Sequence, residues 1–450
     1  MEVETTERAA GAAAVAGGDA PRTMTGAEMV IQALVDQGVT SIFGYPGGAV
    51  LPIYDEIFQQ DRVQHILVRH EQGAGHAAEG YARSSGKPGV LLVTSGPGAT
   101  NAVTALTDAM MDSIPIVCIT GQVPTHLIGN DAFQECDTVG ITRPCTKHNW
   151  LVRSVHDLPR ILHEAFYVAT SGRPGPVVVD IPKDVQIASG IYQGPQNVVH
   201  KTYRPRLKGD LGAIRTTVEM MANAKRPILY TGGGVINSGP RASRLLRELA
   251  DLTGFPVTST LMGLGAVPAS HPNWLGMLGM HGTYEANLAM HGCDLMINVG
   301  ARFDDRITGR LDAFSPGSRK VHIDIDPSSI NKTVKVDVGI VGDCGHVLED
   351  LIAVWKETGA KPDAAGLKDW WRTIAGWRAR KSLHYERRPD VIMPQESIER
   401  LYELTKHEDV YITTEVGQHQ MWAAQFFHFH EPNRWMTSGG LGTMGYGLPA

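Results

Sequence analysis

The stretch GVLLVTSGPGATNAVTALTDAMMDSIPIVCITG, residues 89–121, indicates the fold class. An apolar, β-branched run (89–95) passes through a glycine turn into a helical pattern (101–113), and a second apolar run follows (114–121). Apolar strands separated by helices are typical of a parallel sheet that is covered by helices on both faces. The stretch therefore predicts an α/β fold built on a parallel sheet.

The same alternation continues on both sides of this stretch. An amphipathic helix is expected at 26–38, and strands are expected at 41–46 and 175–182, before a linker (188–210) rich in Gly, Pro and polar residues. The pattern then restarts, with strands and one helix expected at 226–234, 241–253 (the helix), 255–260, 293–303 and 320–326. A third unit begins near Met393 with a strand at 409–417, and residue 450 falls where its next helix should start.

These boundaries predict two α/β domains and the beginning of a third. We place the first domain at 24–188, the second at 207–357 and the incomplete third at 393–450. Residues 1–23 are Ala- and Gly-rich, have no signal- or transit-peptide pattern, and are predicted to form a disordered tail.

Composition excludes several classes of protein. Over 450 residues the net charge is only −6 and no Lys/Arg run occurs, so nucleic acid and anionic membranes are poor candidates as partners. No apolar run is long enough to span a membrane. The five cysteines are dispersed without a CxxC pair, which predicts reduced thiols in a cytoplasmic protein.

Three polar or glycine-rich positions are candidate ligand contacts. Glu71 lies between an apolar run (65–68) and a helix made mostly of Gly and Ala, so it either faces water or binds a ligand. The turn SGPGATN (95–101) joins a strand to a helix, where free backbone N–H groups suit an anion or close packing. The turn YTGGGVINSG (230–239) lacks the G-x-G-x-x-G spacing and is a weak dinucleotide signal.

Ten motifs in the same order carry a family resemblance. They are FGYPGGAVLPIYD (43–55), HEQGAGHAAEGYAR (70–83), SGPGATN (95–101), GQVPT (121–125), DAFQE (131–135), SGRPGPVVVDIPKDV (171–185), GMHG (279–282), GARFDDRITG (300–309), GQHQMWAAQ (417–425) and TSGGLGTMGYGLPA (437–450). Together they resemble the catalytic subunit of the acetohydroxyacid synthase (acetolactate synthase) family over about residues 24 to 450. The resemblance implies pyrimidine-binding, central FAD-binding and diphosphate-binding domains, the last one partial.

The family joins two 2-ketoacids, pyruvate with pyruvate or 2-ketobutyrate, using thiamine diphosphate (ThDP), Mg2+ and FAD, in valine, leucine and isoleucine biosynthesis. The resemblance makes Glu71 the acid that faces N1′ of the ThDP pyrimidine ring. Gly48 would present backbone to the reacting carbon, where a side chain would collide. Gln134 would contact the same centre, or else be a surface amide.

The resemblance also implies binding residues. The ThDP diphosphate would lie at Gly417, Gln418, His419 and Gln420, beside Gly442, while Met444 would support the thiazolium ring or else be core. FAD would contact Arg173, Gly232, Gly233, Gly234, His281, Gly282, Gly300, Arg302, Asp324 and Asp343. Substrate positions would be Phe133, Lys183, Met280, Asp305 and Arg306. Arg306 would bind a ketoacid carboxylate, or else pair only with Asp304 or Asp305.

The chain departs from the family pattern at its end. The GDG-type motif and the Asn that hold Mg2+ in the family follow GYGLPA there, so no metal ligand is assigned in this sequence and a truncated protein is expected. An inactive FAD-binding fragment is therefore one alternative. Another is a different flavin-containing ThDP enzyme such as pyruvate oxidase, whereas Glu71 argues against glyoxylate carboligase. The expected assembly is a homodimer or homotetramer, with a possible small regulatory subunit.

Overall fold

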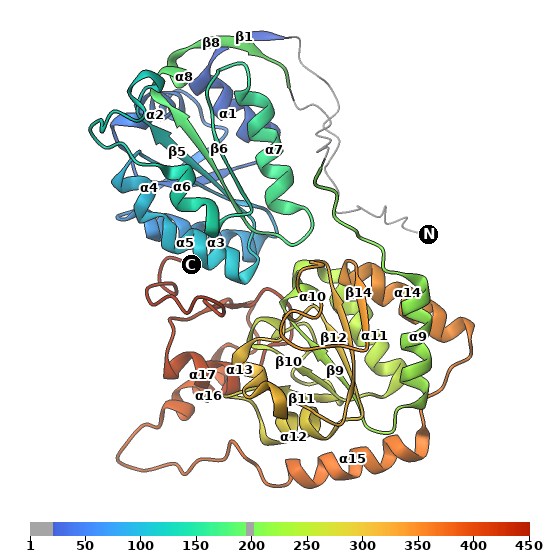
Figure 1. Cartoon of the computed structure of the whole chain (residues 1–450). Helices are drawn as coiled ribbons and strands as arrows, with labels where there is room; N and C mark the ends of the chain where they lie inside the picture. Colours follow the sequence, from blue (N-terminus) through green and yellow to red (C-terminus); the bar gives the residue numbers. More distant parts are fainter. Residues whose placement is uncertain (1–20, 195–201) are drawn as a thin grey trace, which may run out of the picture.

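The computed structural model describes residues 21–194 and 202–450. The first unit is a parallel six-stranded sheet (Figure 1). Its strands, in spatial order, are β3 (Gln64–Leu67), β2 (Ser41–Gly44), β4 (Gly89–Val93), β5 (Ile116–Gln122), β7 (Pro176–Pro182) and β6 (His148–Leu151). The predicted parallel α/β fold is confirmed.

Helices cover both faces of this sheet, as the apolar strands predicted. Alternate residues of β4 and β5 point to opposite sides: Val90 and Val117 join the core under α1 (Gly26–Asp36) and α7 (Leu158–Thr170). Leu91 and Cys118 join the core under α3 (Glu71–Ser85) and α5 (Val103–Asp112). The shorter helices are α2 (Leu51–Phe58), α4 (Pro97–Asn101), α6 (Thr138–Thr142) and α8 (Lys183–Ile187), with 3-10 turns at Gly48–Val50, Thr125–Leu127 and Arg143–Cys145.

A small antiparallel pair corrects two boundaries. β1 (Arg22–Thr25) pairs with β8 (Ser189–Tyr192), so the last residues of the predicted tail and the first residues of the predicted linker are strands. The amphipathic pattern of a four-residue edge strand is too short to detect without its partner. Residues 1–20 of the tail and 195–201 of the linker lie outside the described residues.

The second unit is another parallel six-stranded sheet. Its strands, in spatial order, are β11 (Trp274–Met277), β10 (Val257–Ser259), β9 (Pro227–Thr231), β12 (Leu295–Val299), β13 (Arg319–Asp324) and β14 (Val338–Val341). In chain order this is 3-2-1-4-5-6, the order of doubly wound nucleotide-binding sheets, with its switch point between β9 and β12.

Helices cover both faces of the second sheet as well. α9 (Leu211–Asn223), α11 (Pro240–Thr253) and α14 (Cys344–Glu357) share one core, and α12 (Tyr284–Gly292) and α15 (Ala364–Arg378) share the other. Short helical segments lie at Gly233–Asn237 (α10), Leu261–Gly263, Asp305–Thr308 (α13) and Leu311–Ala313. α15 lies beyond the boundary predicted at residue 357, yet Trp370 is buried and its indole N–H donates to Pro227 O at 3.1 Å. The unit therefore continues past that boundary.

The third unit is small and packs on the second. It contains α16 (Pro394–Thr405), α17 (Gln418–Phe426) and a two-stranded parallel pair, β15 (Ile412–Thr413) and β16 (Trp435–Met436). The strand predicted at 409–417 is thus reduced to two residues. From α17 the chain runs back to the first unit, where Gly80 of α3 lies against the Ala450 carbonyl (Figure 1).

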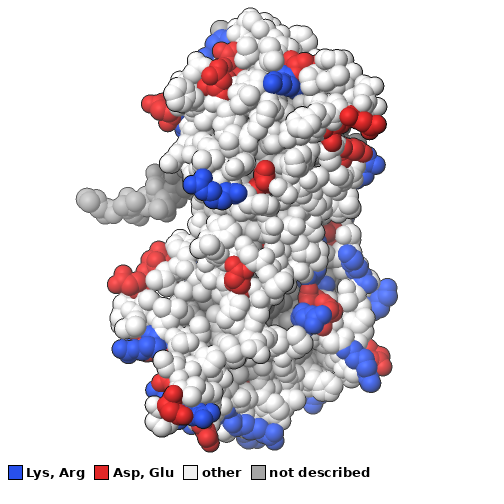
Figure 2. Space-filling model, turned by 90° about the vertical axis from the view of Figure 1, so that its left-hand side faces the viewer, with Lys and Arg blue, Asp and Glu red and all other residues white. Residues whose placement is uncertain are grey.

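The surface and the thiols agree with the composition. Figure 2 shows Lys and Arg side chains interspersed with Asp and Glu over one face, without a large area of one sign. The five cysteines are free thiols, four of them buried. No helix among the described residues is both long enough and apolar enough to cross a bilayer.

Candidate active site

The candidate site lies along one edge of the first sheet. In a parallel sheet the carboxyl ends of all strands meet at the same edge, and ligands bind where the strand order reverses. Here that point lies between β2 and β4. The Gly47–Gly48 turn follows β2, Glu71 follows β3, and the 95–98 turn follows β4.

Glu71 is the first residue of α3 and is only 8 % exposed. Asn101, at the end of α4, donates its amide N–H to Glu71 Oε2 at 2.9 Å. The other oxygen, Oε1, has no hydrogen-bond donor in the described part of the chain, and it would lie 3.4 Å from a Cβ at Gly98. One oxygen is therefore fixed by the protein and the other is available to a ligand.

The glycines and alanines of α3 have a packing role. A Cβ at Gly75 would lie 2.3 Å from Ala105 Cβ, so glycine lets α3 approach α5 closely. Ala78 O lies against Gly89 of β4, and a Cβ at Gly89 would come within 2.2 Å of it. Close packing of α3 on α5 and β4 thus explains why the helix is made mostly of Gly and Ala.

The turn after β2 has one crowded and one open glycine. A Cβ at Gly47 would lie 2.5 Å from Thr94, at the end of β4. A Cβ at Gly48 would meet nothing within 4 Å, so the space beside this residue is open within the chain, and the collision expected with the reacting carbon stays a prediction. Gly47 therefore allows the turn after β2 to approach the end of β4 closely. The sequence analysis did not single out this residue.

The loop 131–137 carries two predicted site residues. Gln134 has a positive φ of 59°, and its carbonyl oxygen would lie 2.6 Å from a Cβ at Gly96, so the loop touches the turn after β4. The neighbouring Phe133 is 88 % exposed. A large aromatic side chain so exposed beside a candidate site is available to a ligand or to a second chain.

A buried carboxyl group that sequence reasoning missed holds this loop. Asp180, in β7, accepts hydrogen bonds from Thr120 Oγ1 at 2.7 Å and Gln122 Nε2 at 2.9 Å. Gln122 Nε2 also donates to the Cys136 carbonyl at 2.8 Å, which ties the loop to β5. Burial raises the pKa of Asp180 to about 7. An acid within an otherwise apolar strand (PVVVDIP) was the available signal.

Lys183 begins α8 at the same carboxyl edge, after β7. The adjacent Asp184 carboxylate accepts from Thr125 N at 3.0 Å and from the Thr125 hydroxyl. The Thr125–Asp184 hydrogen bonds join the GQVPT turn after β5 to α8, and they thereby fix the backbone position of Lys183.

The residues expected at the ThDP diphosphate lie at the start of α17. Gly417 is the N-cap, and the side chains of Gln418 and His419 are exposed. Gln420 instead turns inward, donating to Thr437 Oγ1 at 2.6 Å and to Ser438 O. No hydrogen bond or ion pair joins Glu71 to these residues in the described parts of the chain.

The turn around Met444 is held by a second acid that sequence reasoning missed. Met444 is 78 % exposed, and Gly442 (φ +75°) and Gly445 (φ +96°) on either side of it have backbone angles that favour glycine. Glu415 accepts the backbone N–H groups of Gly445, Tyr446 and Gly447. Burial raises the pKa of Glu415, but these backbone donors outweigh it and hold the pKa below its usual range.

The glycines expected near FAD lie at the switch point of the second sheet. A Cβ at Gly232 would lie 2.3 Å from Gly300 O, and Gly234 N donates to the same oxygen at 3.0 Å. Gly300 has a φ of +68°. A Cβ at Gly233 would lie 3.2 Å from Met262. The turns after β9 and β12 therefore pack backbone to backbone at the place where nucleotides bind such sheets.

Other residues expected near FAD already have partners in the chain. Arg173 Nε donates to Ser113 Oγ at 2.7 Å and its guanidinium reaches Asp326 at 3.5 Å, which links the two sheets' units. Arg302 pairs with Asp304. Asp343 caps α14, accepting from Gly345 N at 3.0 Å. Asp324 accepts from Asp326 N at 2.8 Å, where β13 ends.

The remaining substrate positions cluster on the surface of the second unit. Met280 is 60 % exposed and its N–H donates to Arg306 O at 2.9 Å. Arg306 pairs with Asp305 at 3.1 Å, and both side chains are mostly exposed. Such a pair is worth little and separates easily. Burial and the Arg306 charge lower the pKa of the adjacent His281, and a Cβ at Gly282 would lie 2.5 Å from Met277 O.

Family models give the class of protein. The thiamine pyrophosphate enzyme models match the N-terminal TPP binding domain at residues 24–141, the central domain at 214–351 and the C-terminal TPP binding domain at 415–450. The two sheets and the α17 turn described above are thus those of a thiamine pyrophosphate enzyme.

Individual relatives narrow the class. The large subunit of acetolactate synthase isozyme 3 from Escherichia coli is 52% identical over 429 residues, 95% of this chain and 74% of that protein. Acetolactate synthase from Mycobacterium bovis is 51% identical over 428 residues, 95% of this chain and 69% of that one. The large subunit from Haemophilus influenzae is 51% identical over 431 residues. The chain belongs to the acetolactate synthase large-subunit family, and another class of thiamine enzyme is not favoured.

Proposed function

We propose that this enzyme decarboxylates pyruvate on ThDP and joins the two-carbon unit to a second 2-ketoacid. Pyruvate would give acetolactate and 2-ketobutyrate would give acetohydroxybutyrate, in valine, leucine and isoleucine biosynthesis. Family membership supports this transferase activity. The observation that carries it is Glu71, a carboxylate with one fixed and one available oxygen at the switch point of the first sheet.

Each proposed catalytic residue has a role that its position allows. ThDP, when bound, supplies the stabilised carbanion chemistry that removes CO2 from the ketoacid. Glu71 Oε1 holds a proton toward the pyrimidine ring, while Asn101 keeps the carboxylate from rotating. Gly48 offers open backbone beside it, and Gln134 and Phe133 border the space above the sheet edge.

The other half of the ThDP site is proposed at Gly417, Gln418 and His419, with Met444 below the thiazolium ring. The start of α17 suits an anion, because a helix N-terminus presents unpaired N–H groups. Since no bond joins these residues to Glu71 in this chain, we propose that a second copy supplies the complementary half. That arrangement makes a homodimer, or a homotetramer, the active assembly.

FAD is proposed at the switch point of the second sheet. The 3-2-1-4-5-6 strand order and the paired glycine turns at Gly232–Gly234 and Gly300 fit a nucleotide. Arg173, Arg302, Asp324 and Asp343 would border it with the donors and acceptors that their present partners leave available. We assign FAD a structural role, so no step of the reaction passes through it.

Mg2+, substrate contacts and partners are further parts of the proposal. Mg2+ would neutralise the charge of the diphosphate; the described residues bring no group of three His, Cys, Asp or Glu ligands together at the α17 turn. Arg306 would exchange Asp305 for a ketoacid carboxylate, near Lys183 and Met280.

A small regulatory subunit is proposed because relatives are named large subunits, and we expect the enzyme in the cytoplasm. We propose three domains: 24–188, with the β1–β8 pair at its ends, for the pyrimidine, 207–357, extended through α15, for FAD, and 393–450 for the diphosphate.

Product analysis tests the proposed function. The whole gene product is incubated with pyruvate, ThDP, Mg2+ and FAD, and carbon-labelled products are identified by NMR. Acetolactate as the main product supports the proposal. Acetate or acetyl phosphate as the main product would instead show a pyruvate oxidase, and FAD uptake without any product would show a binding protein.

A further inference from the structure

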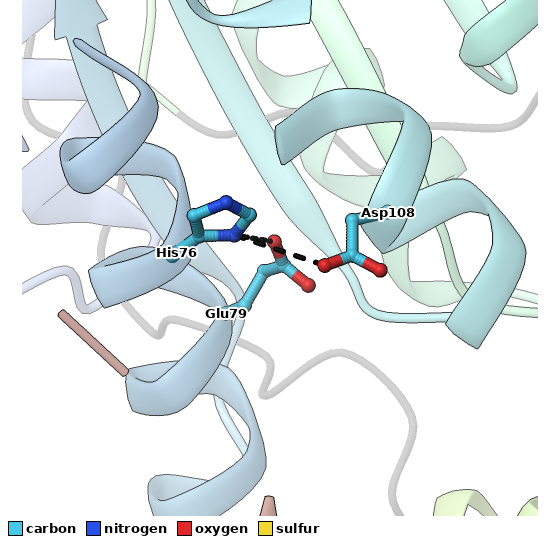
Figure 3. A group of neighbouring side chains, drawn as sticks. All are labelled: His76, Glu79 and Asp108. Carbon is cyan, nitrogen blue, oxygen red and sulfur yellow. Dashed lines mark hydrogen bonds and ion pairs between the residues drawn. The ribbon is translucent and has the colours of Figure 1, made fainter. Parts of the chain in front are cut away.

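The junction between the first unit and the C-terminal segment buries a group of ionisable side chains. His76, Glu79 and Arg83 come from α3, and Asp108 and Asp112 come from α5 (Figure 3 shows three of them). His76, Glu79 and Asp108 are fully buried, and the Arg83 and Asp112 side chains are at most 10% exposed. Residues 437–446 cover this group and exclude water from it.

One acid in the group, Asp112, has a cation as its partner, and both of its contacts are made by Oδ2. Asp112 pairs with Arg83 at 3.0 Å and accepts the backbone N–H of Gly439 at 2.8 Å. Arg83 also donates to Thr437 O at 2.8 Å. The single buried cation is thus used by Asp112, and this pair holds the start of the C-terminal segment onto α3 and α5.

In each of the other two acids, Glu79 and Asp108, only one carboxyl oxygen has a hydrogen-bond partner. Glu79 Oε1 lies 2.9 Å from His76 Nδ1, and Asp108 Oδ1 accepts from the Ser438 hydroxyl at 2.7 Å. Glu79 Oε2 and Asp108 Oδ2 are buried and have no hydrogen-bond partner in the described part of the chain. One oxygen of each acid lies within 4.8 Å of the other, and Figure 3 shows the two carboxyl groups next to each other.

Burial outweighs the Arg83 charge, which lowers the pKa of both of these acids. Burial lowers the pKa of His76 to about 4, so its ring is neutral at physiological pH and Nδ1 carries the proton given to Glu79. Burial, and then Asp108, raise the pKa of Glu79 well above its usual value, and burial raises that of Asp108 to about 6. The other ionisable groups facing them are the Tyr446 phenol, which burial keeps neutral, and Glu415 near His76. Two enclosed carboxylates in this position cannot both ionise.

We propose that the buried Glu79–Asp108 pair carries a single proton between its two carboxyl groups, and that this proton positions the 437–446 segment against α3. The shared proton removes the repulsion that would drive the two acids apart. Asp108 then keeps its hydrogen bond from the Ser438 hydroxyl. The 437–446 segment in turn holds the Met444 turn in place. Because α3 begins at Glu71, the two acids act as positioning residues between the two proposed halves of the ThDP site on one chain.

A bound cation is the competing explanation for the same atoms. His76, Glu79 and Asp108 offer one nitrogen and two carboxylate ligands. However, zinc needs a fourth ligand, and Mg2+ or Ca2+ needs several oxygens, usually including water. Among the described His, Cys, Asp and Glu residues this group brings only three ligand atoms together, so a proton is the better counter-charge.

Proton linkage tests the proposal on the purified chain, without ThDP or activity. The pKa of Glu79 is higher folded than unfolded, so its contribution to stability is present below the unfolded pKa and is lost as pH rises through the folded one. As pH rises above 4.5, the usual pKa of Glu, the wild-type unfolding constant should rise by up to about tenfold per pH unit more than that of E79Q. E219Q, an exposed Glu→Gln change on α9, is the matched control and should follow the wild type.

Infrared spectroscopy detects the proton directly. The wild type at neutral pH should show a protonated carboxyl band that E79Q lacks. An unfolding constant with the same pH dependence in E79Q, or no protonated carboxyl band in D180N, would overturn the proposal. D180N removes the contribution of Asp180, whose pKa burial also raises to about 7, so its band decides even if E79Q does not fold. Zn2+ or Mg2+ alone raising the Tm of the wild type but not of E79Q would favour a cation and also overturn it.

Discussion

Replacing Glu71 by Gln is the sharpest perturbation of the proposed site. Gln has the same shape, and its amide oxygen can still accept the Asn101 N–H that now reaches Glu71 Oε2 at 2.9 Å. The side chain is only 8 % exposed, so the replacement should stay in place. What E71Q removes is a group able to hold and release a proton at Oε1.

The expected loss follows from that difference. A positioned proton-transfer group contributes about 10²- to 10⁴-fold, which corresponds to roughly 2.7–5.5 kcal/mol in the barrier. ThDP binding should persist, because the proposed diphosphate contacts at the start of α17 are unchanged. The effect should therefore fall on the rate and leave the ThDP affinity nearly the same.

Hydrogen–deuterium exchange at C2 of bound ThDP is the assay. The whole gene product, E71Q and N101A are mixed with deuterated buffer, quenched in acid and analysed by proton NMR. N101A keeps the acid but removes its donor, so a smaller loss of about 1.5–3 kcal/mol is expected. Exchange in E71Q at the wild-type rate, with ThDP bound, would refute the role given to Glu71.

Three further predictions concern the sheets. The chain should take up FAD and show bound flavin absorbance; a folded protein without FAD affinity would contradict the second-unit site. G232A should lower the unfolding free energy by about 1–3 kcal/mol, because its Cβ would lie 2.3 Å from Gly300 O. The control G376A, at an open position in a helix, should raise the unfolding free energy by roughly 0.5–1 kcal/mol. Equal denaturant midpoints for the two variants would argue against this packing. Burial raises the Asp180 pKa to about 7, so stability from this acid is lost as pH rises toward 7, and D180N should flatten that dependence in urea unfolding.

Much of the fold could be predicted from local patterns. Runs such as GVLLV (89–93) are apolar at every position and so predicted strands buried on both faces. Glu71 and Gly232 follow apolar runs, which predicted that they lie at sheet edges. β1 and β8 could not be predicted, because each is a strand only through its pairing with a distant segment. β15 was predicted too long, because Glu415 leaves the strand direction to accept N–H groups from residues 445–447.

The site was less predictable than the fold. The family motifs named Glu71, but its fixed oxygen depends on Asn101, thirty residues away in sequence and adjacent only after folding. The local signal for Asp180 was only an acid within an apolar strand. Glu415 and the Glu79–Asp108 pair act through contacts across the fold, so no local pattern indicates them. The small residues of α3 could be seen in the sequence, but their reason, the close packing of Gly75 against Ala105 of α5, depends on the fold.

A structure of the whole gene product with ThDP bound would test the central claim most directly, namely that the carboxyl edge of the first sheet, at Glu71, is the catalytic centre. We predict a pyrimidine ring nitrogen at hydrogen-bond distance, roughly 2.6–3.2 Å, from Glu71 Oε1, with Oε2 still held by Asn101. A pyrimidine ring bound away from the Gly47–Gly48 and 95–98 turns, with Glu71 bonded only to Asn101 and water, would contradict the claim.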